Sequence, residues 1–386
     1  MNTIKTVLLG SALSLVFPFA ANAQDATPDT DALRREIAEL RGQIADMNRD
    51  HTPSELDKAR AKATKRLVRE VLADAESRRS LRNQSPLSLD VSGFAVTRFQ
   101  YADGGGSDKR HEFSIPYARL QFSGDVYDFG YVVSGEFSDQ TSGNFDLVDA
   151  YITRDFGFAD FKVGQFVSSF YKGYTDSPLD QLNGEYTLIA NTYGQGRSQG
   201  IEFSKDFGWL DLTAGYNDGF NSANGASVAN EYGINVRGDV DFGGGFSAGA
   251  GYSYQSLTAT DYSTFTVDAG YAGGGWDFGV SYVARDLDAN GGWSDNYGIV
   301  GSVAYQCTED LQGFFQYENG KVGAGTDLNL LTVGANYDLA KGVRWTTSVG
   351  YAFDAVDGAW DFGRTGWSAS SDSGQYVVST QIAISF

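Results

Sequence analysis

The final segment of the chain, residues 376–386, alternates between apolar and polar positions and ends on Phe386. A period of two residues is that of a β-strand, because successive side chains point to opposite faces. One face of this segment suits an apolar surrounding and the other suits water. The same alternation recurs in residues 210–217, 265–271 and 343–351. The pattern therefore predicts β-strands over most of the chain.

Sixteen such segments follow one another after residue 86. They are predicted to begin near residues 87, 112, 129, 146, 158, 197, 208, 230, 245, 261, 275, 294, 310, 328, 342 and 374. Alternate connections are tight, at 125–128, 155–157, 206–208, 242–245, 272–275, 307–309 and 339–341. Most of the others are long and polar, at 103–111, 166–196, 218–230, 286–294, 319–327 and 354–373. Short turns at one end and long loops at the other, with an even number of strands, are typical of bacterial outer-membrane barrels.

These connections predict the fold class, an all-β transmembrane barrel of about 16 antiparallel strands. A soluble sandwich shows the same alternation within strands but has no reason to sort its loops by length. In hydrocarbon a free strand edge finds no hydrogen-bond partner, so the first strand must pair with the last. Sixteen strands enclose an aqueous channel rather than a packed interior.

The first 84 residues follow other patterns. Residues 1–23 are predicted to be a signal peptide, with Lys5, an apolar run and the small residues Ala21 and Ala23 at the cleavage site. Residues 24–84 are predicted to form a short α-helical coiled-coil stalk in the periplasm, and 85–386 the barrel. The helical interpretation rests on apolar residues spaced by four and three, Leu33, Ile37, Leu40, Ile44 and Met47. A single amphipathic helix lying on another surface remains an open alternative.

Charge is distributed unevenly along the chain. The formal net charge is −20. Residues 25–84 hold 13 Lys and Arg against 12 Asp and Glu, whereas residues 85–386 hold 15 against 37. An acidic barrel argues against a nucleic-acid partner, because the phosphate backbone requires a positive surface. The one cysteine, Cys307, excludes an internal disulfide, and no cofactor or metal site is predicted.

Several short motifs resemble those of the phosphate-selective porin O and P family. They are residues 67–75 of the helical segment, 162–166, 197–202 and the terminal Ile384-Ser385-Phe386. The resemblance implies a homotrimer of 16-stranded barrels, each with the loop after its fifth strand folded into its own pore. The terminal strand also resembles the signal by which the barrel assembly machinery recognises its substrates, which makes Phe386 the predicted assembly signal. One departure is that a phosphate pore needs inward Lys and Arg, while this barrel is acidic.

The longest connection, residues 166–196, follows the fifth strand and is the predicted pore constriction. It carries Asp176, Asp180 and Glu185 against Lys172. Loops of this length are uncommon and usually functional. We expect an acidic lip that narrows the lumen. The open alternative is an extracellular loop that covers the trimer or binds lipopolysaccharide.

Basic residues are predicted to line the lumen opposite this lip. By parity along the strands they are Arg119, Arg237 and Arg344, with Arg154 or Lys162 as a further candidate. Opposed charges of this kind would set up a transverse field across the constriction. The alternative is that these residues belong to a solvated interior without special roles.

The sequence thus predicts an outer-membrane porin for passive diffusion of small hydrophilic solutes and ions, with a weak cation preference. Its partners would be outer-membrane lipid and lipopolysaccharide, with cell-wall contact through the stalk. An enzyme is disfavoured, because the histidine-activated nucleophiles of hydrolases need a His and only His51 and His111 are present. Two alternatives remain, a structural anchor that tethers the envelope through its coiled coil, and an anion- or phosphate-selective pore.

Overall fold

The structure is a computed structural model of the whole chain. It describes residues 87–104, 109–139, 141–219, 223, 230–258, 261–287, 293, 295–325 and 327–386. The signal peptide and the stalk predicted for residues 1–84 lie outside these ranges. No helix within them is long and apolar enough to cross a membrane.

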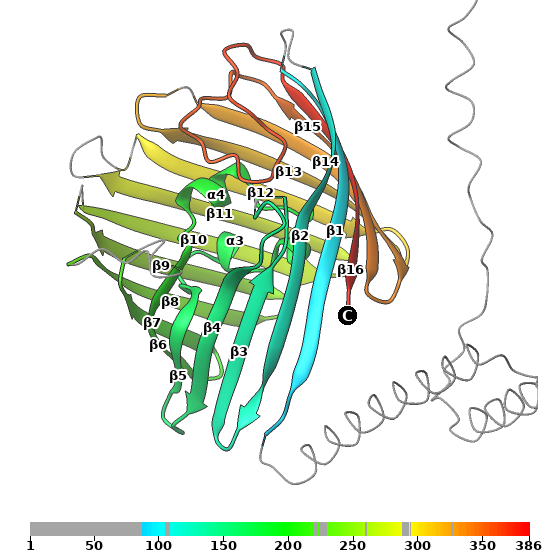
Figure 1. The fold of residues 1–386 in the computed structure, drawn as a ribbon. Helices are drawn as coiled ribbons and strands as arrows, with labels where there is room; N and C mark the ends of the chain where they lie inside the picture. The colour runs from blue at the N-terminus through cyan, green and yellow to red at the C-terminus, as the bar shows by residue number, and fades with distance from the viewer. Residues whose placement is uncertain are drawn as a thin grey trace, which may run out of the picture. The chain divides into compact units, whose positions relative to one another are not determined.

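The strands form one closed antiparallel barrel (Figure 1). The first eight strands are β1 Asp90–Asp103, β2 Lys109–Val126, β3 Phe129–Glu136, β4 Asp146–Asp155, β5 Asp160–Val167, β6 Arg197–Asp206, β7 Leu210–Asn217 and β8 Tyr232–Gly243. The others are β9 Phe246–Ser256, β10 Asp261–Gly273, β11 Trp276–Leu287, β12 Asn296–Gln306, β13 Leu311–Val322, β14 Leu328–Ala340, β15 Val343–Ala352 and β16 Tyr376–Ser385. Each strand pairs with its neighbours in the sequence, and β1 pairs with β16. The prediction of a 16-stranded antiparallel barrel is confirmed.

The predicted strand starts lie within three residues of the observed ones. For example, β4 begins at residue 146 as predicted, and β1 begins at residue 90 instead of 87. Short turns recur at every second connection. In two of these turns Gly157 and Gly208 have positive φ, and their N–H groups donate to Asp155 and Asp206. Such Asx turns are a local signal that the sequence carries directly.

The barrel closes where β1 meets β16. Arg98 lies opposite Gln381 in the register of this seam, and Phe94 lies opposite Ser385. Beyond the last ladder position, Phe386 N–H donates to Gly93 O and Gly93 N–H donates to Phe386 O, both at 3.1 Å. The terminal residue therefore completes the seam with two backbone hydrogen bonds.

Deleting Phe386 is expected to impair barrel insertion and to leave export intact. The deletion removes two backbone hydrogen bonds of the seam, at about 0.5–1.5 kcal/mol each, and the aromatic end of the predicted assembly signal. The measurement is heat-modifiable migration of outer-membrane fractions. A deletion variant with wild-type levels of folded barrel would contradict this role of the terminus.

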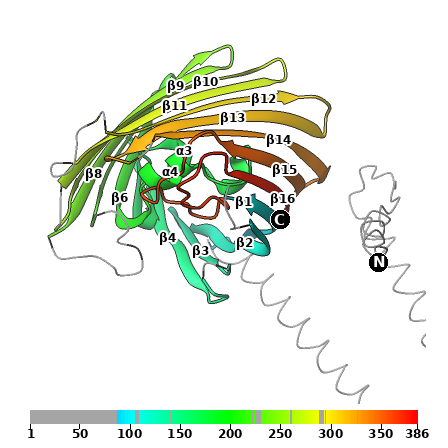
Figure 2. The same ribbon diagram turned by 90° about the horizontal axis from the view of Figure 1, so that it is seen from above.

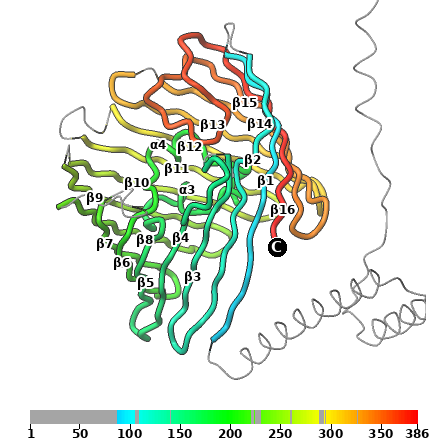
Figure 3. Tube along the Cα trace, viewed as in Figure 1, coloured from blue at the N-terminus to red at the C-terminus, as the bar shows by residue number. Residues whose placement is uncertain are grey.

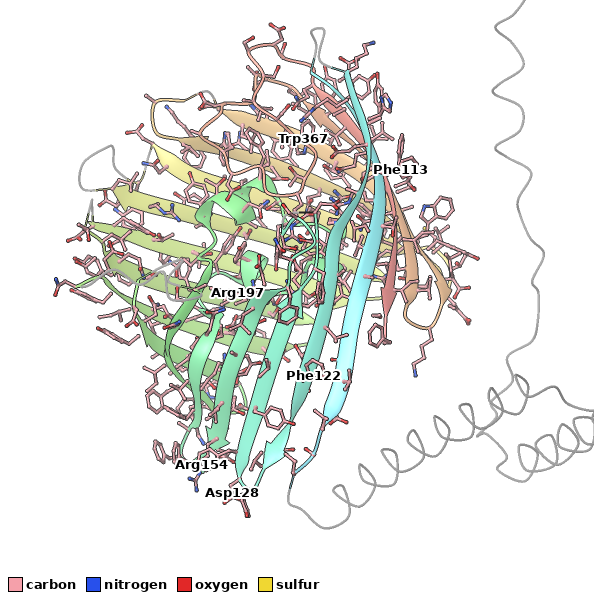
Figure 4. The ribbon with its side chains drawn as sticks, viewed as in Figure 1. Phe113, Phe122, Asp128, Arg154, Arg197 and Trp367 are labelled. Atoms are coloured by element: carbon pink, nitrogen blue, oxygen red, sulfur yellow. The ribbon has the colours of Figure 1, made fainter. Side chains whose placement is uncertain are left out.

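The outer surface of the barrel is apolar. On β15 the outward residues include Trp345, Val349 and Tyr351, all exposed, whereas Thr346 and Ser348 face inward and are buried. Aromatic side chains gather at the short turns: Tyr127, Phe156, Phe158, Phe207, Trp209, Phe242 and Phe246 are exposed there. Exposed apolar strands bounded by aromatic residues are what a lipid-facing barrel requires. In Figure 4, Asp128 and Arg154 mark this end of the strands.

The interior holds an apolar cluster, which is unusual for the lumen of a wide barrel. Two connections fold inward to build it. One is residues 168–196 between β5 and β6, here called the eyelet loop, and the other is residues 353–375 between β15 and β16, here called the closing loop (Figure 3). The cluster includes Leu188 and Ile189 of the eyelet loop and Val356, Trp360 and Trp367 of the closing loop. Seen from above, the helices of the eyelet loop lie inside the ring of strands (Figure 2).

Candidate functional site

The eyelet loop contains three short helical turns. They are α3 Lys172–Thr175, η1 Pro178–Asp180 and α4 Leu188–Tyr193. Thr187 starts α4, because its side chain accepts a hydrogen bond from Ala190 N–H, which the first turn of a helix otherwise leaves unpaired.

The barrel wall holds the eyelet loop at both ends. At the start of the loop, Arg237 of β8 donates to Phe170 O at 3.4 Å. Further along, Ile189 N–H donates to the Glu318 carboxylate of β13 at 3.2 Å, and Glu318 is 5% exposed. Because these partners are rigid strand residues, the loop has a fixed place in the lumen.

Asp176 and Asp180 reach open space inside the barrel. Both carboxylates are exposed, as is Lys172. They line a cavity of about 390 Å³ together with Asp268 of β10 and Asp277 of β11. Asp180 also lines a second cavity of about 680 Å³, on the side of the short turns, which includes Arg344. The middle of the eyelet loop therefore presents two carboxylates and one ammonium group to the aqueous interior.

The charge of Asp176 is expected to depend on pH. Desolvation by the surrounding loop raises the pKa of its carboxyl, and the nearby Asp180 adds to this effect while Lys172 opposes it. A raised pKa means that Asp176 gains a proton, and loses its negative charge, at a higher pH than an ordinary aspartate near 3.9. We expect any cation preference of the pore to weaken as the pH falls, before ordinary aspartates titrate. The measurement is the reversal potential at a series of pH values. In Asp176→Asn the reversal potential should change less with pH in the range above the titration of ordinary aspartates.

Glu185 differs from the other two acids of the loop. Its carboxylate is 4% exposed and forms an ion pair with Arg98 of β1 at 3.0 Å. It also accepts hydrogen bonds from Tyr117 OH at 2.6 Å and from Tyr186 N–H at 3.0 Å. Its charge is compensated and shielded from water, so its geometry is that of an anchor for the loop.

The three basic residues predicted for the lumen face inward, and each is paired with an acid. Arg119 pairs with Glu136 at 2.9 Å, Arg237 with Asp268 at 2.8 Å and also with Asp239, and Arg344 with Asp338 at 2.7 Å. Arg237 is 5% exposed, whereas Arg344 is partly open to the second cavity. Because each carboxylate lies within 3 Å of its guanidinium, the field of each guanidinium is partly cancelled.

Further charged side chains lie on the wall formed by β2 to β6. Lys162 pairs with Glu202 at 2.6 Å, and Arg197 pairs with Asp149 at 2.9 Å. Arg197 is labelled near the middle of the barrel in Figure 4. Of the two further candidates from the sequence, Lys162 belongs to this wall, while Arg154 lies at the rim, 3.9 Å from Asp128 and over the Phe129 ring.

Sequence reasoning missed Arg364, Arg98 and the closing loop. Arg364 contacts the Glu136 carboxylate and Pro116 O, and its guanidinium lies 4.2 Å from the centre of the Tyr117 ring. No periodicity marks a long polar connection as one that folds inward. For Arg98 a signal was present, since it shares the inward parity of Val96 and Gln100 on β1.

The matching family model is that of the Gram-negative porins, and it covers residues 71–358. The chain belongs to the Gram-negative porin family. A search of the curated proteins finds no match. The family and the barrel fold indicate an outer-membrane channel for small solutes rather than an enzyme. They support the porin part of the resemblance seen in the sequence, while its finer part, the phosphate-selective porin O and P family, stays a prediction.

Solved porins share the fold at low sequence identity. The anion-selective porin from Comamonas acidovorans is 18% identical, with a TM-score of 0.61 over 78% of this porin and 100% of that chain. OmpF of Salmonella typhi, in complex with daunomycin, is 17% identical, with a TM-score of 0.59 over 78% and 98%. OmpT of Vibrio cholerae, an outer-membrane protein in its trimer form, is 16% identical, with a TM-score of 0.59 over 78% and 99%.

Proposed function

We propose that this porin is a water-filled channel for passive diffusion of small hydrophilic solutes and ions, with a weak to moderate preference for cations. The observation that carries the cation preference is the state of the charges in the lumen. The inward basic side chains described above are paired with carboxylates. Asp176, Asp180 and Asp277 face the cavity of about 390 Å³ with no ion pair among the described residues.

Uncompensated carboxylates at a narrow aqueous passage favour cations. Lys172 stands beside them and reduces the effect, which is why we expect a preference and not strict selectivity. The experiment is the reversal potential of single channels in a planar bilayer under a KCl gradient. A reversal potential with the sign expected for cation selectivity supports the proposal, and the opposite sign contradicts the cation preference. A barrel that inserts into the bilayer without conducting contradicts the proposal of a channel.

A second candidate is an anion-selective pore, in keeping with the resemblance to the phosphate-selective porin O and P family. The observation in its favour is the group of basic side chains at one wall, which are Arg119, Lys162 and Arg197 on the strands and Arg364 of the closing loop. The Comamonas acidovorans porin of the same fold is anion-selective by its description. Against this, each of the four basic residues lies within ion-pair distance of an acid of the wall, namely Glu136, Asp149 or Glu202. The same reversal potential separates the two candidates by its sign.

We propose a homotrimer in the outer membrane, in contact with lipid and lipopolysaccharide and inserted by the barrel assembly machinery. The trimer form of the Vibrio cholerae protein supports the oligomeric state by analogy of fold. The apolar outer surface supports the contact with lipid. In this proposal the stalk contacts the cell wall. The alternative is a purely structural anchor, in which the stalk makes the same contact and the barrel does not conduct.

A variant that keeps residues 1–23 and lacks residues 24–84 is expected to form a conducting pore of unchanged selectivity. The reason is that the closed barrel of β1 to β16 is complete within residues 90–385. Bilayer conductance and heat-modifiable migration of the shortened chain measure this. If the shortened chain fails to insert, residues 24–84 belong to the barrel and the proposed domain boundary is wrong.

A further inference from the structure

Arg98 is the largest fully buried side chain among the described residues, at 2% exposure, although it is a charged residue. A buried guanidinium is stable only when its donors are paired. Its Nε donates to Gln381 Oε1 at 2.7 Å, and one terminal nitrogen donates to Arg364 O at 2.6 Å. The other terminal nitrogen donates to Glu185 Oε2 at 3.0 Å and to Gly184 O at 3.5 Å.

These acceptors come from three different elements. Gln381 belongs to β16, Arg364 to the closing loop, and Gly184 and Glu185 to the tip of the eyelet loop. Arg98 itself is on β1, opposite Gln381 in the register. One side chain therefore joins both inward-folded loops to the seam where the barrel closes.

Neighbouring side chains strengthen the same junction. Tyr117 of β2 donates to Glu185, and Gln381 donates to Gly184 O at 3.4 Å. Gln100 of β1 donates to Thr365 O at 3.1 Å, one residue beyond the carbonyl that Arg98 binds. The eyelet tip thus spans β16, β1 and β2 from inside, and the closing loop lies against the same strands.

The fit at the tip is close. Gly184 has φ +62°, and a Cβ at this position would lie 2.0 Å from Gln381 Nε2. By contrast, Gly323, in the connection after β13, has φ +59° and nothing within 4 Å of the position of a Cβ. An alanine at either position would be equally strained in its backbone, but only at Gly184 would its Cβ meet another side chain. The two substitutions therefore form a matched test and control.

We propose that Arg98 is the positioning residue of this channel: it fixes the eyelet tip and the closing loop to the β1/β16 seam and so keeps the pore in its open geometry. Arg98 does not face the solute path, because it is buried. It acts through Glu185, Gly184 and the Arg364 carbonyl. The inference rests on the proposed channel, and it adds that the open state depends on this one buried side chain as well as on the wall contacts at Phe170 and Ile189.

The first experiment separates positioning from folding with Arg98→Met and the double variant Arg98→Met/Glu185→Gln. Removing one partner leaves a buried charge unpaired, which is strongly destabilising, while removing both costs much less. We expect the single variant to lose folded barrel in heat-modifiable migration and the double variant to recover it. In bilayers the double variant should still close about tenfold more often than wild type, since the loss of a charge-assisted hydrogen bond exceeds the energy of one decade.

The second experiment leaves every charge in place. Gly184→Ala should raise the closing frequency in the same way, and Gly323→Ala, which has the same backbone strain, should behave as wild type. A wild type that does not conduct would refute the channel itself. The wild type is the reference for the closing frequency. If the double variant and Gly184→Ala both assemble and close as rarely as a conducting wild type, the role of Arg98 is overturned. If Gly323→Ala closes as often as Gly184→Ala, backbone strain explains the effect and the proposal is also overturned.

Discussion

Neutralising Asp176 and Asp180 together is expected to shift the reversal potential of the channel toward anions. Both carboxylates face the cavity of about 390 Å³ beside Lys172, and no ion pair compensates them among the described residues. In a tenfold KCl gradient an ideally selective pore reaches about 59 mV. We expect a wild-type value on the cation side of on the order of 10 mV, and its loss or reversal in Asp176→Asn/Asp180→Asn.

Glu185→Gln provides the contrast for this experiment. The sequence placed Glu185 with the other two acids, but in the structure it is buried and paired with Arg98. We expect its substitution to affect assembly and closing and to leave the sign of the reversal potential unchanged. A shift in Glu185→Gln as large as that of the double variant would contradict this division of roles.

Salt concentration tests the same electrostatic origin. Charges more than a Debye length of about 8–10 Å away are screened at physiological salt, and that length falls to about 3 Å at 1 M. The many acids in outer connections therefore contribute little to the reversal potential. A preference set by Asp176 and Asp180 should fade as the mean salt concentration rises at a constant gradient.

The strands were predictable from the sequence because their signal is local. Alternation of polarity, turns such as those at Gly157 and Gly208, and the sorting of connections by length all act over a few residues. An apolar outer face and a polar lumen follow once the barrel is closed. This is why the predicted starts agree with the observed strands while the long connections carried no comparable signal.

The candidate site was predictable only in part, because it depends on contacts between distant residues. Arg98 and Glu185 are 87 positions apart, and Arg98 and Arg364 are 266 apart. Parity places Arg98 inside the barrel, but it does not reveal which loop reaches it. The same limit applied to Glu185, whose charge looked equivalent to that of Asp176 until its partner was known.

Trp360→Ala is expected to release the closing loop from the lumen and to raise the open-channel conductance. Trp360 is 3% exposed and packs edge-on against Tyr193 of α4, with the ring centres 6.2 Å apart. Truncation of a buried tryptophan costs about 3–5 kcal/mol, and Trp360 is one of three buried apolar residues that the closing loop places in the cluster. Single-channel conductance measures the wider passage, and it should rise on the order of twofold as the loop leaves the aqueous cross-section.

Proteolysis reports the release of the loop independently of the current. Arg364 is the one Lys or Arg in residues 353–375, so trypsin has a single site there. In the wild type its side chain is 20% exposed and is held by Glu136. We expect trypsin to cut after Arg364 much faster in Trp360→Ala.

The control is Trp345→Ala. Trp345 is an outward residue of β15 at 44% exposure, and its indole donates to Thr380 outside the lumen. Equal cleavage and equal conductance in the two tryptophan variants would show that the polar contacts of Arg98 and Gln100 hold the closing loop without the packing of Trp360.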